Sequence, residues 1–393
     1  MATFAGGRVP EVAVGISGAE SVARFAAERG TRSAVLIVDR SAVDNGYAGD
    51  IVSALHDAVP DLEHLERYVV PGVEPDASSV DAAAALVRTT PGSIVIGIGG
   101  GSALDTAKQA SAVAAASFGI EHYAMGAERF PGHRPLIAIP TTAGTGAEVT
   151  RTCIVSDRRG RKVWTWGDEL LPDLVVLDPI ATVTLPADVT AATGLDAFVH
   201  AIEAASGRRT TALVTTPALH ALRLVVDHLP AAVARPDDLA ARQAMQEAAL
   251  LAGLAIDGGG TGIAHSIGHA MGTLGHVPHG VAVAIGLAAT LDWNVEGEPA
   301  AYASVASALG RRVAELPHVL DELVDAVALS SAVRRLPELE LDAEQIAASM
   351  IAEENLPMYR NNCRLANDAQ RRQLAVRTLA VWNDLRRDVG GPR

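Results

Sequence analysis

Histidines are unevenly distributed in the second half of this chain. Of 12 histidines among 393 residues, four fall between positions 265 and 279. They are His265, His269, His276 and His279. The first two are four residues apart, which places both on one face of a helix, and Asp196 and His200 have the same spacing. A single buried histidine is more often a hydrogen-bonded core residue than a ligand. A carboxylate together with several imidazoles, however, indicates a site for a divalent metal such as Fe2+ or Zn2+.

A glycine-rich segment, GIGGGS at 97–102, joins the apolar run at 93–98 to a predicted helix that starts near Ala103. Glycine permits positive φ and close approach of the backbone to a ligand, and a helix start offers N–H groups to an anion. A diphosphate fits such a turn. The sequence is not the common G-x-G-x-x-G fingerprint, so a tight turn without a ligand is the alternative interpretation.

A second polar loop, PTTAGTGAEVT at 140–150, follows the apolar run at 136–139 and contains four threonines and two glycines. Its donors suit a nicotinamide amide, a ribose or phosphates, and a plain surface loop is the alternative. Asp39 ends a third apolar run, 33–39. A carboxylate there binds an adenosine ribose and repels a 2′-phosphate, which favours NAD over NADP, unless Asp39 is an ordinary turn residue.

The elements that would position these residues change in type along the chain. Continuous apolar runs predict strands buried on both faces of a parallel sheet, and helical segments alternate with them. The expected strands are 33–39, 66–70, 93–98, 136–139 and 174–177, and the expected helices are 43–57, 77–89 and 103–117. From about residue 185, segments rich in Ala and Leu at helical spacing take over. The sequence predicts an α/β domain over residues 1–183 and an all-helical domain over 184–393.

Composition excludes several classes of protein. With 49% hydrophobic and 20% charged residues, the chain can bury a core and is not predominantly disordered. A net charge of −14 without a local basic patch argues against binding to nucleic acid or to an anionic membrane surface. We find no apolar stretch long enough to cross a bilayer and no signal-peptide pattern at the start. Because Cys153 and Cys363 do not form a disulfide framework, a cytoplasmic protein is expected.

Four motifs together resemble the iron-dependent (group III) alcohol dehydrogenase family. In chain order they are GGGSALDTAK at 99–108, PTTAGTGAEVT at 140–150, Gly194-Leu195-Asp196 with His200, and His265-x3-His269-x9-His279-Gly280. The resemblance spans nearly the whole chain. It implies a dehydroquinate-synthase-like fold, α/β plus all-α, with an N-terminal Rossmann-like nucleotide-binding domain and a C-terminal helical metal-binding domain. It also implies a homo-oligomer, namely a dimer.

The same resemblance implies an activity and residue roles. The expected reaction is NAD(H)-dependent interconversion of a small primary alcohol and its aldehyde by hydride transfer, with Fe2+ as the metal and Zn2+ as the alternative. Four positions match the family's metal ligands: Asp196, His200, His265 and His279. The positions that match cofactor-binding residues are Asp39, Gly100, Gly101, Ser102, Thr141, Thr142, Thr145, Thr150 and Lys162. His269 matches a histidine that is not a ligand, and we expect it to relay the hydroxyl proton; His276 matches no family role.

Departures from the family pattern leave alternatives open. Arg151, with Trp164 and Trp166 on the nearby segment, suits an anionic substrate group, which would make the enzyme a reductase of a phosphono-, sulfo- or carboxy-aldehyde. The alternative is an arginine paired with an acid. Asp76-Ala77 and Asn362-Cys363-Arg364 replace patterns that many members carry. A dehydroquinate-synthase-type lyase and a non-redox metal- or nucleotide-binding protein are the competing classes.

Overall fold

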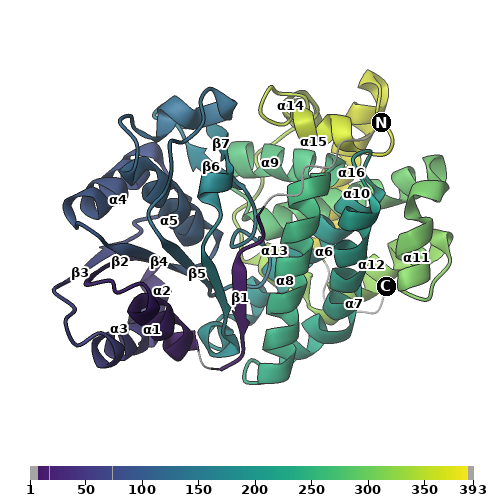
Figure 1. Cartoon of the computed structure of the whole chain (residues 1–393). Coiled ribbons are helices and arrows are strands. Elements are labelled where there is room, and N and C mark those ends of the chain that lie inside the picture. The colour runs from purple at the N-terminus through teal and green to yellow at the C-terminus, as the bar shows by residue number, and fades with distance from the viewer. Residues whose placement is uncertain (1–7, 17, 73, 388–393) are drawn as a thin grey trace. The chain divides into compact units, whose positions relative to one another are not determined.

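The computed structural model describes residues 8–16, 18–72 and 74–387 (Figure 1). Their contacts divide into two compact units. The first contains the described residues up to Thr142 together with Gly146–Thr184, and the second contains Ala143–Thr145 and the described residues from Leu185 onward. The residues Ala143–Thr145 belong to the threonine-rich loop, so this loop contributes to both units.

A parallel sheet forms the centre of the first unit. Among the described residues, six strands pair in the order β1-β8-β5-β4-β2-β3, and every pairing is parallel. The strands are β1 (Glu11–Val14), β2 (Ser33–Val38), β3 (His64–Val69), β4 (Ile94–Gly99), β5 (Leu136–Pro140) and β8 (Leu174–Leu177). Strands β2, β4, β5 and β8 are buried along their whole length, as their continuous apolar sequences predict.

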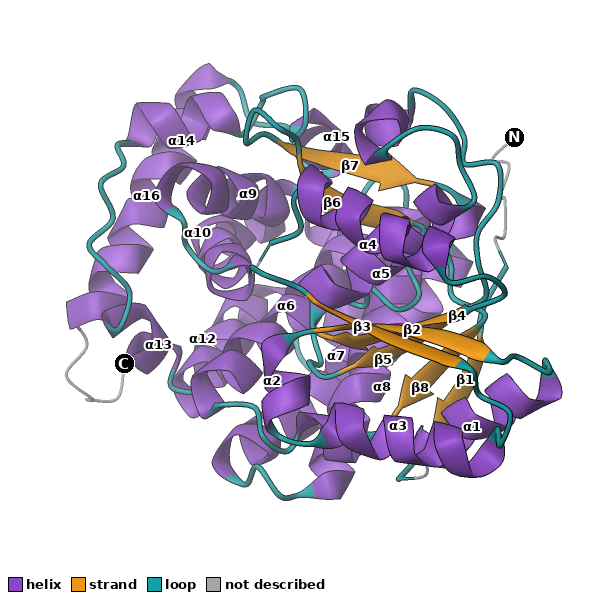
Figure 2. Cartoon of the chain, turned by 90° about the vertical axis from the view of Figure 1, so that its left-hand side faces the viewer, coloured by secondary structure: helices purple, strands orange, loops and turns teal. Residues whose placement is uncertain are grey.

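Helices cover both faces of this sheet (Figure 2). They are α1 (Gly18–Glu28), α2 (Arg40–Asp44), α3 (Tyr47–Ala58), α4 (Ala77–Thr89) and α5 (Gly101–Ala114). Val35 and Ile37 of β2 pack into the core with α4 and α5, whereas Leu36 packs into the core with α1 and α3. Because successive side chains of a strand point to opposite faces of the sheet, β2 contributes residues to two apolar cores. Short 3₁₀ helices follow: η1 (Ile120–Gly126), η2 (Asp168–Leu170) and η3 (Pro179–Thr182).

The sequence-based prediction missed or merged some elements of the first unit. Strand β1 and the antiparallel hairpin of β6 (Thr152–Ser156) and β7 (Lys162–Trp166) were not expected. All three are short and only partly buried, so they lack the long apolar runs that marked the other strands. The expected single helix 43–57 is wrong. It is broken between α2 and α3, where Gly46 has φ +88, a left-handed conformation that favours glycine.

The strand order creates a switch point beside the glycine turn. From β2 the chain continues outward to β3 and then returns to β4 on the other side of β2. Ligands of open parallel sheets bind where the order reverses, outside the carboxyl ends of the strands. The loops that follow β2 and β4 begin with Asp39 and Gly100, so both lie at this point.

Helices and loops, but no strand, make up the described residues of the second unit. The α-helices are α6 (Ala187–Ser206), α7 (Ala212–Ala234), α8 (Leu239–Gly259), α9 (Ile263–Gly275), α10 (His279–Gly297), α11 (Ala303–Ala308), α12 (Leu316–Ala326), α13 (Leu329–Arg334), α14 (Ala343–Ser349), α15 (Leu356–Asn361) and α16 (Asp368–Arg387). The 3₁₀ helices are η4 (Pro299–Tyr302) and η5 (Val313–Glu315). Helix α6 packs against α7, α8 and α10, and α9 packs against α10. No described helix is both long and apolar enough to cross a membrane.

Small residues set the distance between α9 and α10. A Cβ atom added at Gly286 of α10 would lie 2.5 Å from the carbonyl oxygen of Ala264 in α9. At Gly49 of α3, by contrast, an added Cβ would meet no atom within 4 Å. Gly286 is therefore required by helix packing, whereas Gly49 is not.

The two glycines make a matched pair of alanine variants. We expect Gly286→Ala to lower the free energy of unfolding by about 1–3 kcal/mol, because backbone atoms must move. Gly49→Ala should raise it by about 0.4–1 kcal/mol through the smaller entropy of the unfolded chain. Urea unfolding of both variants tests this, and a stability loss of equal size in both would contradict the packing argument.

Candidate metal and cofactor sites

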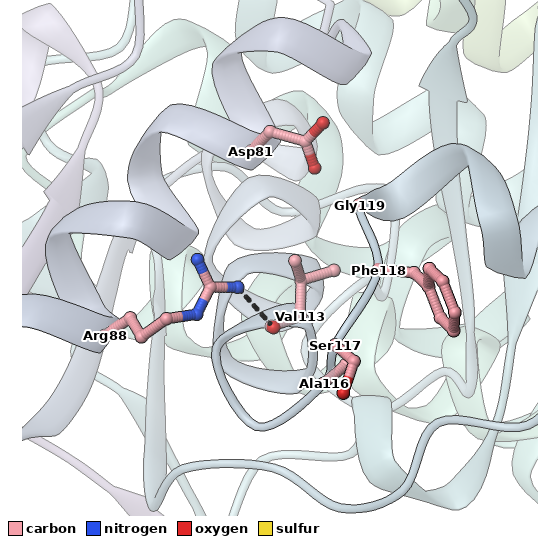
Figure 3. A pocket seen from close by; sticks show the side chains of 7 residues that line it. All are labelled: Asp81, Arg88, Val113, Ala116, Ser117, Phe118 and Gly119. Carbon is pink, nitrogen blue, oxygen red and sulfur yellow. Dashed lines mark hydrogen bonds between the residues drawn. The ribbon is translucent and has the colours of Figure 1, made fainter.

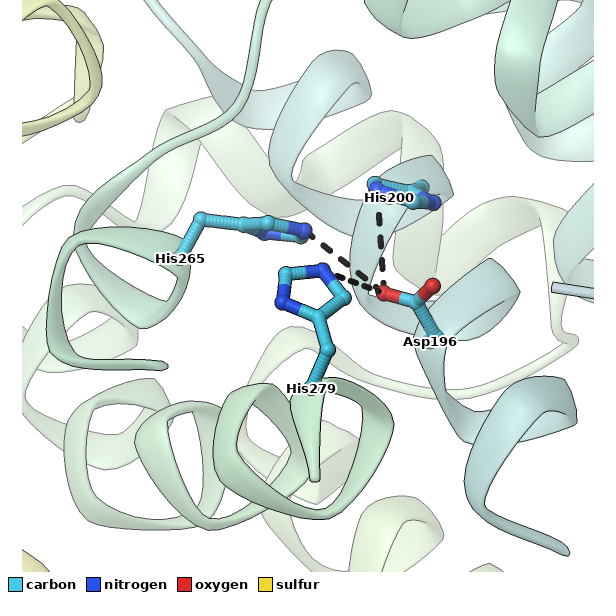
Figure 4. A group of neighbouring side chains, drawn as sticks. All are labelled: Asp196, His200, His265 and His279. Atoms are coloured by element: carbon cyan, nitrogen blue, oxygen red, sulfur yellow. Dashed lines mark ion pairs between the residues drawn. The ribbon is translucent and has the colours of Figure 1, made fainter. Parts of the chain in front are cut away.

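Three helices of the second unit bring one carboxylate and three imidazoles together (Figure 4). Asp196 and His200 lie one turn apart on α6, His265 is on α9, and His279 is the first residue of α10. The Nε2 atoms of His200 and His265 both lie 3.6 Å from Asp196 Oδ1, and that of His279 lies 3.5 Å from it. One ligand atom from each residue falls within 4.8 Å of all the others.

These side chains fit a divalent cation. Asp196 Oδ1 and His265 Nε2 are buried and have no hydrogen-bond partner among the described residues. Buried polar atoms are normally satisfied, so this pair points to a missing ligand. Four ligands about 2.1 Å from a tetrahedral ion are about 3.4 Å apart, close to the 3.5 to 3.6 Å that separates Asp196 Oδ1 from each of the three Nε2 atoms. One carboxylate oxygen with three imidazole nitrogens suits Fe2+ or Zn2+.

The ionisation state of Asp196 also suits a metal ligand. Burial by itself raises the pKa of this carboxyl group, but the neighbouring His200 and His279 outweigh burial and hold the pKa well below its usual range. The carboxylate is therefore ionised at neutral pH, which is the form that binds a metal.

The Nδ1 atoms of His265 and His200 form hydrogen bonds with other groups of the protein. His265 Nδ1 lies 2.6 Å from Glu203 Oε2, and His200 Nδ1 lies 3.3 Å from the carbonyl oxygen of Gly144. Both acceptors take a proton from Nδ1, so Nε2, which lies on the side of Asp196, is the nitrogen of each ring that would bind a metal. This arrangement sets the tautomer that metal binding requires.

Glu203 was not predicted from the sequence, although it lies seven residues after Asp196 on the same face of α6. Its carboxylate also accepts hydrogen bonds from the N–H groups of Gly262 at 2.8 Å and Ala264 at 2.7 Å. It therefore caps the positive end of α9, the helix that carries His265. Burial lowers the pKa of His265, but the adjacent carboxylates of Asp196 and Glu203 outweigh burial and raise it to about 9, so a bound metal would displace a proton from this ring.

The two remaining histidines of the cluster differ in their surroundings. The ring of His269 lies 5.5 Å from that of His279 and 6.4 Å from that of His265, measured between centroids. It is half-buried beside the proposed metal ligands. His276 is exposed and ends α9 in a left-handed conformation with φ 52. The structure thus places His269 close to the proposed ligands and gives His276 a terminal position on the helix.

In the first unit, Asp39 joins the ends of three neighbouring strands. Its Oδ2 accepts hydrogen bonds from the Gly100 N–H and the Thr141 hydroxyl, both at 3.3 Å. Its Oδ1 accepts from the Ala42 N–H at 2.7 Å and so caps α2. The residues that follow β2, β4 and β5 therefore meet at one edge of the sheet.

The glycine turn forms the start of α5. Gly99 has φ +155, and a Cβ there would lie 2.5 Å from Ala103 Cβ and 2.8 Å from Asp39 Oδ2, so only glycine fits. Gly100 is the N-cap and, as a glycine, has no side chain that could cap the helix. Gly101 and Ser102 form its first turn. The helix dipole and first-turn N–H groups favour a negatively charged ligand at this end.

The other predicted cofactor residues have different surroundings. The methyl carbon of Thr142 would be 3.3 Å from a Cβ at Gly100, so it borders the turn. Thr145 belongs to the second, helical unit. The buried Thr150 donates its hydroxyl to the Thr152 carbonyl at 3.1 Å. Lys162 lies on β7, where its Nζ forms an ion pair with Glu74.

Arg151 is 9% exposed and has an acidic neighbour. Its Nη1 lies 3.5 Å from Asp168 Oδ1, and its guanidinium carbon lies 5.1 Å from the centre of the Trp166 ring. Pairing with an acid, the alternative considered from the sequence, is thus present in the structure.

A pocket of about 460 Å³ lies near the carboxyl ends of α4 and α5 (Figure 3). It is lined by Asp81, Arg88, Val113, Ala116, Ser117, Phe118 and Gly119. Arg88 donates to the Val113 carbonyl at 3.0 Å, and Asp81 accepts from the Ile120 N–H at 2.9 Å. Its two charged side chains thus serve the local backbone, and we assign the pocket no chemistry.

Comparison with protein families agrees with this arrangement. Residues 10–179 match the family described as iron-containing alcohol dehydrogenase, and residues 190–378 match the C-terminal part of the Fe-containing alcohol dehydrogenase family. The chain belongs to the iron-containing alcohol dehydrogenase family. It is an oxidoreductase that acts on CH–OH groups, and the resemblance drawn from its sequence is confirmed.

Individual relatives extend the comparison. The chain is 35% identical over 294 residues to 1-propanol dehydrogenase of Citrobacter freundii, covering 74% of each chain. It is 30% identical over 310 residues to NAD-dependent methanol dehydrogenase of Bacillus methanolicus, covering 78% of this chain and 80% of that one. The crystal structure of sulfoacetaldehyde reductase from Bifidobacterium kashiwanohense with NAD+ has a TM-score of 0.87, 26% identity, and coverage of 97% and 99%. The predicted fold class is confirmed.

Proposed function

We propose that this enzyme interconverts a small primary alcohol and its aldehyde, with NAD(H) as the hydride carrier and a divalent metal at Asp196, His200, His265 and His279. The observation that carries the proposal is the buried pair Asp196 Oδ1 and His265 Nε2, which have no hydrogen-bond partner among the described residues. When bound, the metal supplies Lewis-acid polarisation of the substrate oxygen, and NAD supplies hydride exchange with the substrate carbon.

The chain's own residues hold these groups and move the proton. Gly100, Gly101 and Ser102 bind the diphosphate at the start of α5, where the N-cap residue is a glycine. Asp39 disfavours a 2′-phosphate because its carboxylate lies at the strand ends. His269 relays the hydroxyl proton, since imidazoles exchange protons near neutral pH.

The first test is NADH consumption at 340 nm by the Fe2+-loaded enzyme with propanal. We expect steady NADH oxidation and at least about tenfold lower kcat/KM with NADPH, because Asp39 would face the added phosphate. Equal use of NADPH would contradict the role of Asp39. Absence of NADH oxidation with every aldehyde, despite bound metal and NADH, would favour a lyase that returns the hydride within each turnover.

An anionic aldehyde is a second candidate substrate. The similarity to sulfoacetaldehyde reductase supports it, as does the presence of Arg151 next to the threonine-rich loop. In this case we expect sulfoacetaldehyde to exceed propanal at least about tenfold in kcat/KM, because one charged pair contributes about 1.5–3 kcal/mol. Arg151→Gln should remove that preference while leaving propanal reduction in place. A preference that survives the substitution would exclude Arg151 as its source.

We also propose a cytoplasmic homodimer. Strand β1 lies at the edge of the sheet, and its last residue Val14 and the nearby Val9 and Ile16 are exposed, which suits burial against a second copy. Cys153 and Cys363 are both free thiols, as is usual in a reducing compartment. Light scattering and cell fractionation test these two statements.

A further inference from the structure

Helix α5 contains a lysine whose side chain is completely buried. Lys108 has an exposed fraction of 0% and lies two turns after the glycine turn on the same helix. A buried ammonium group is strongly unfavourable unless its hydrogen-bonding capacity is used. Its partners therefore show what the residue does.

Those partners are backbone groups of the threonine-rich loop and the segment after it. Lys108 Nζ donates to the carbonyl oxygen of Ala147 at 2.6 Å and to that of Thr150 at 2.8 Å. Longer contacts of 3.4 Å reach the Thr150 hydroxyl and the Thr152 carbonyl. An ammonium group has three donors, so one side chain gathers three carbonyls that occur within six residues.

Asp105, three residues before Lys108 on α5, also binds the backbone of the segment that follows the loop. Asp105 Oδ2 accepts a hydrogen bond from the Ile154 N–H at 2.9 Å, and its Oδ1 lies 3.8 Å from Lys108 Nζ. Burial raises the pKa of Asp105, and the charge of Lys108 opposes that rise. The two side chains thus use one face of α5 to hold the end of the loop and the start of β6.

We propose that Lys108 is a positioning residue that fixes the threonine-rich loop relative to the glycine turn. Helix α5 starts at that turn and continues without a break for two turns to Lys108. The hydrogen bonds of Lys108 therefore hold the end of the threonine-rich loop at a set distance from the glycine turn. The inference rests on the proposed function, in which both loops bind NAD. Lys108 itself touches neither cofactor nor substrate in this role.

Lys108→Met tests the proposal, with Val113→Ala as the matched control. Val113 is buried on the same helix, but its side chain lies near the far end of α5, so its truncation lowers stability without releasing the loop. We expect Lys108→Met to raise the Kd for NADH about 10- to 100-fold, measured by NADH fluorescence, because a shift of about 1 Å in a binding group has effects of this size. Val113→Ala should stay within about twofold of the parent enzyme.

Two further measurements separate the possible results. Metal content should be unchanged in Lys108→Met, because the proposed metal ligands lie on other helices. Hydrogen exchange in 141–152 should be faster in Lys108→Gln, which also serves if Lys108→Met does not fold. Parent-like NADH affinity and parent-like exchange in a folded Lys108 variant would overturn the inference. If the parent enzyme itself binds no NADH, the proposed function fails instead.

Discussion

Replacing His265 with alanine is expected to lower kcat/KM for aldehyde reduction at least about 100-fold and to reduce bound Fe2+ well below one per chain. The substitution removes one of three imidazole nitrogens that surround Asp196 Oδ1 and leaves that buried carboxylate with less positive charge around it. Loss of the metal removes several kilocalories per mole of transition-state stabilisation. Each increase of about 1.36 kcal/mol in the activation free energy lowers the rate tenfold, so a loss of at least about 100-fold is expected. Metal analysis and NADH oxidation measure the two outcomes separately.

The matched control is His276→Asn, which changes a histidine in the same cluster of the sequence. His276 is exposed, and its left-handed backbone suits asparagine. We expect this variant to keep its metal and its activity within about twofold, since surface changes have small effects. Full metal content and activity in His265→Ala would reject the proposed ligand set. Equal losses in both variants would show that the effect does not depend on that set.

Features fixed by local spacing were predictable from the sequence. Asp196 and His200 meet because residues four apart share a helix face, and that rule needs no tertiary information. The turn at Gly99 and Gly100 was recognisable because consecutive glycines between an apolar run and a helical segment are typical of a tight strand-to-helix turn. The same holds for β2 and β4, whose continuous apolar sequences require burial on both faces.

Features that depend on distant partners were not predictable. Glu203 gains its role from His265, 62 residues away, and Lys108 from the carbonyl of Ala147, 39 residues away. A carbonyl acceptor is present in every residue, so nothing in the sequence of the loop indicates a lysine partner. Hairpin strands β6 and β7 are short and alternate in burial, which leaves too few apolar residues in a row to mark them.

Replacing Glu203 with glutamine is expected to weaken metal binding about 10- to 100-fold, the usual effect of removing the outer partner of a metal-bound histidine. The carboxylate accepts from His265 Nδ1 and from two N–H groups at the start of α9. A glutamine has one oxygen and one NH2 group in the same space. If its oxygen accepts from Ala264, its NH2 group faces His265 Nδ1 and favours the tautomer with the proton on Nε2. That tautomer has no lone pair for a metal.

Metal affinity is best measured by Co2+ titration against a chelator, with the visible Co2+ spectrum reporting the geometry of the ligands. Glu247→Gln is the control, because Glu247 lies on α8 and accepts a hydrogen bond from Gln243 at 2.8 Å without contacting the proposed ligands. It should bind Co2+ as the parent enzyme does. Glu203→Gln also separates the two roles of the carboxylate, since glutamine keeps one acceptor for the start of α9. A lower melting temperature with unchanged Co2+ affinity and spectrum would limit Glu203 to capping the helix. Weaker binding with an altered spectrum, at a similar melting temperature, would establish that it selects the tautomer of His265.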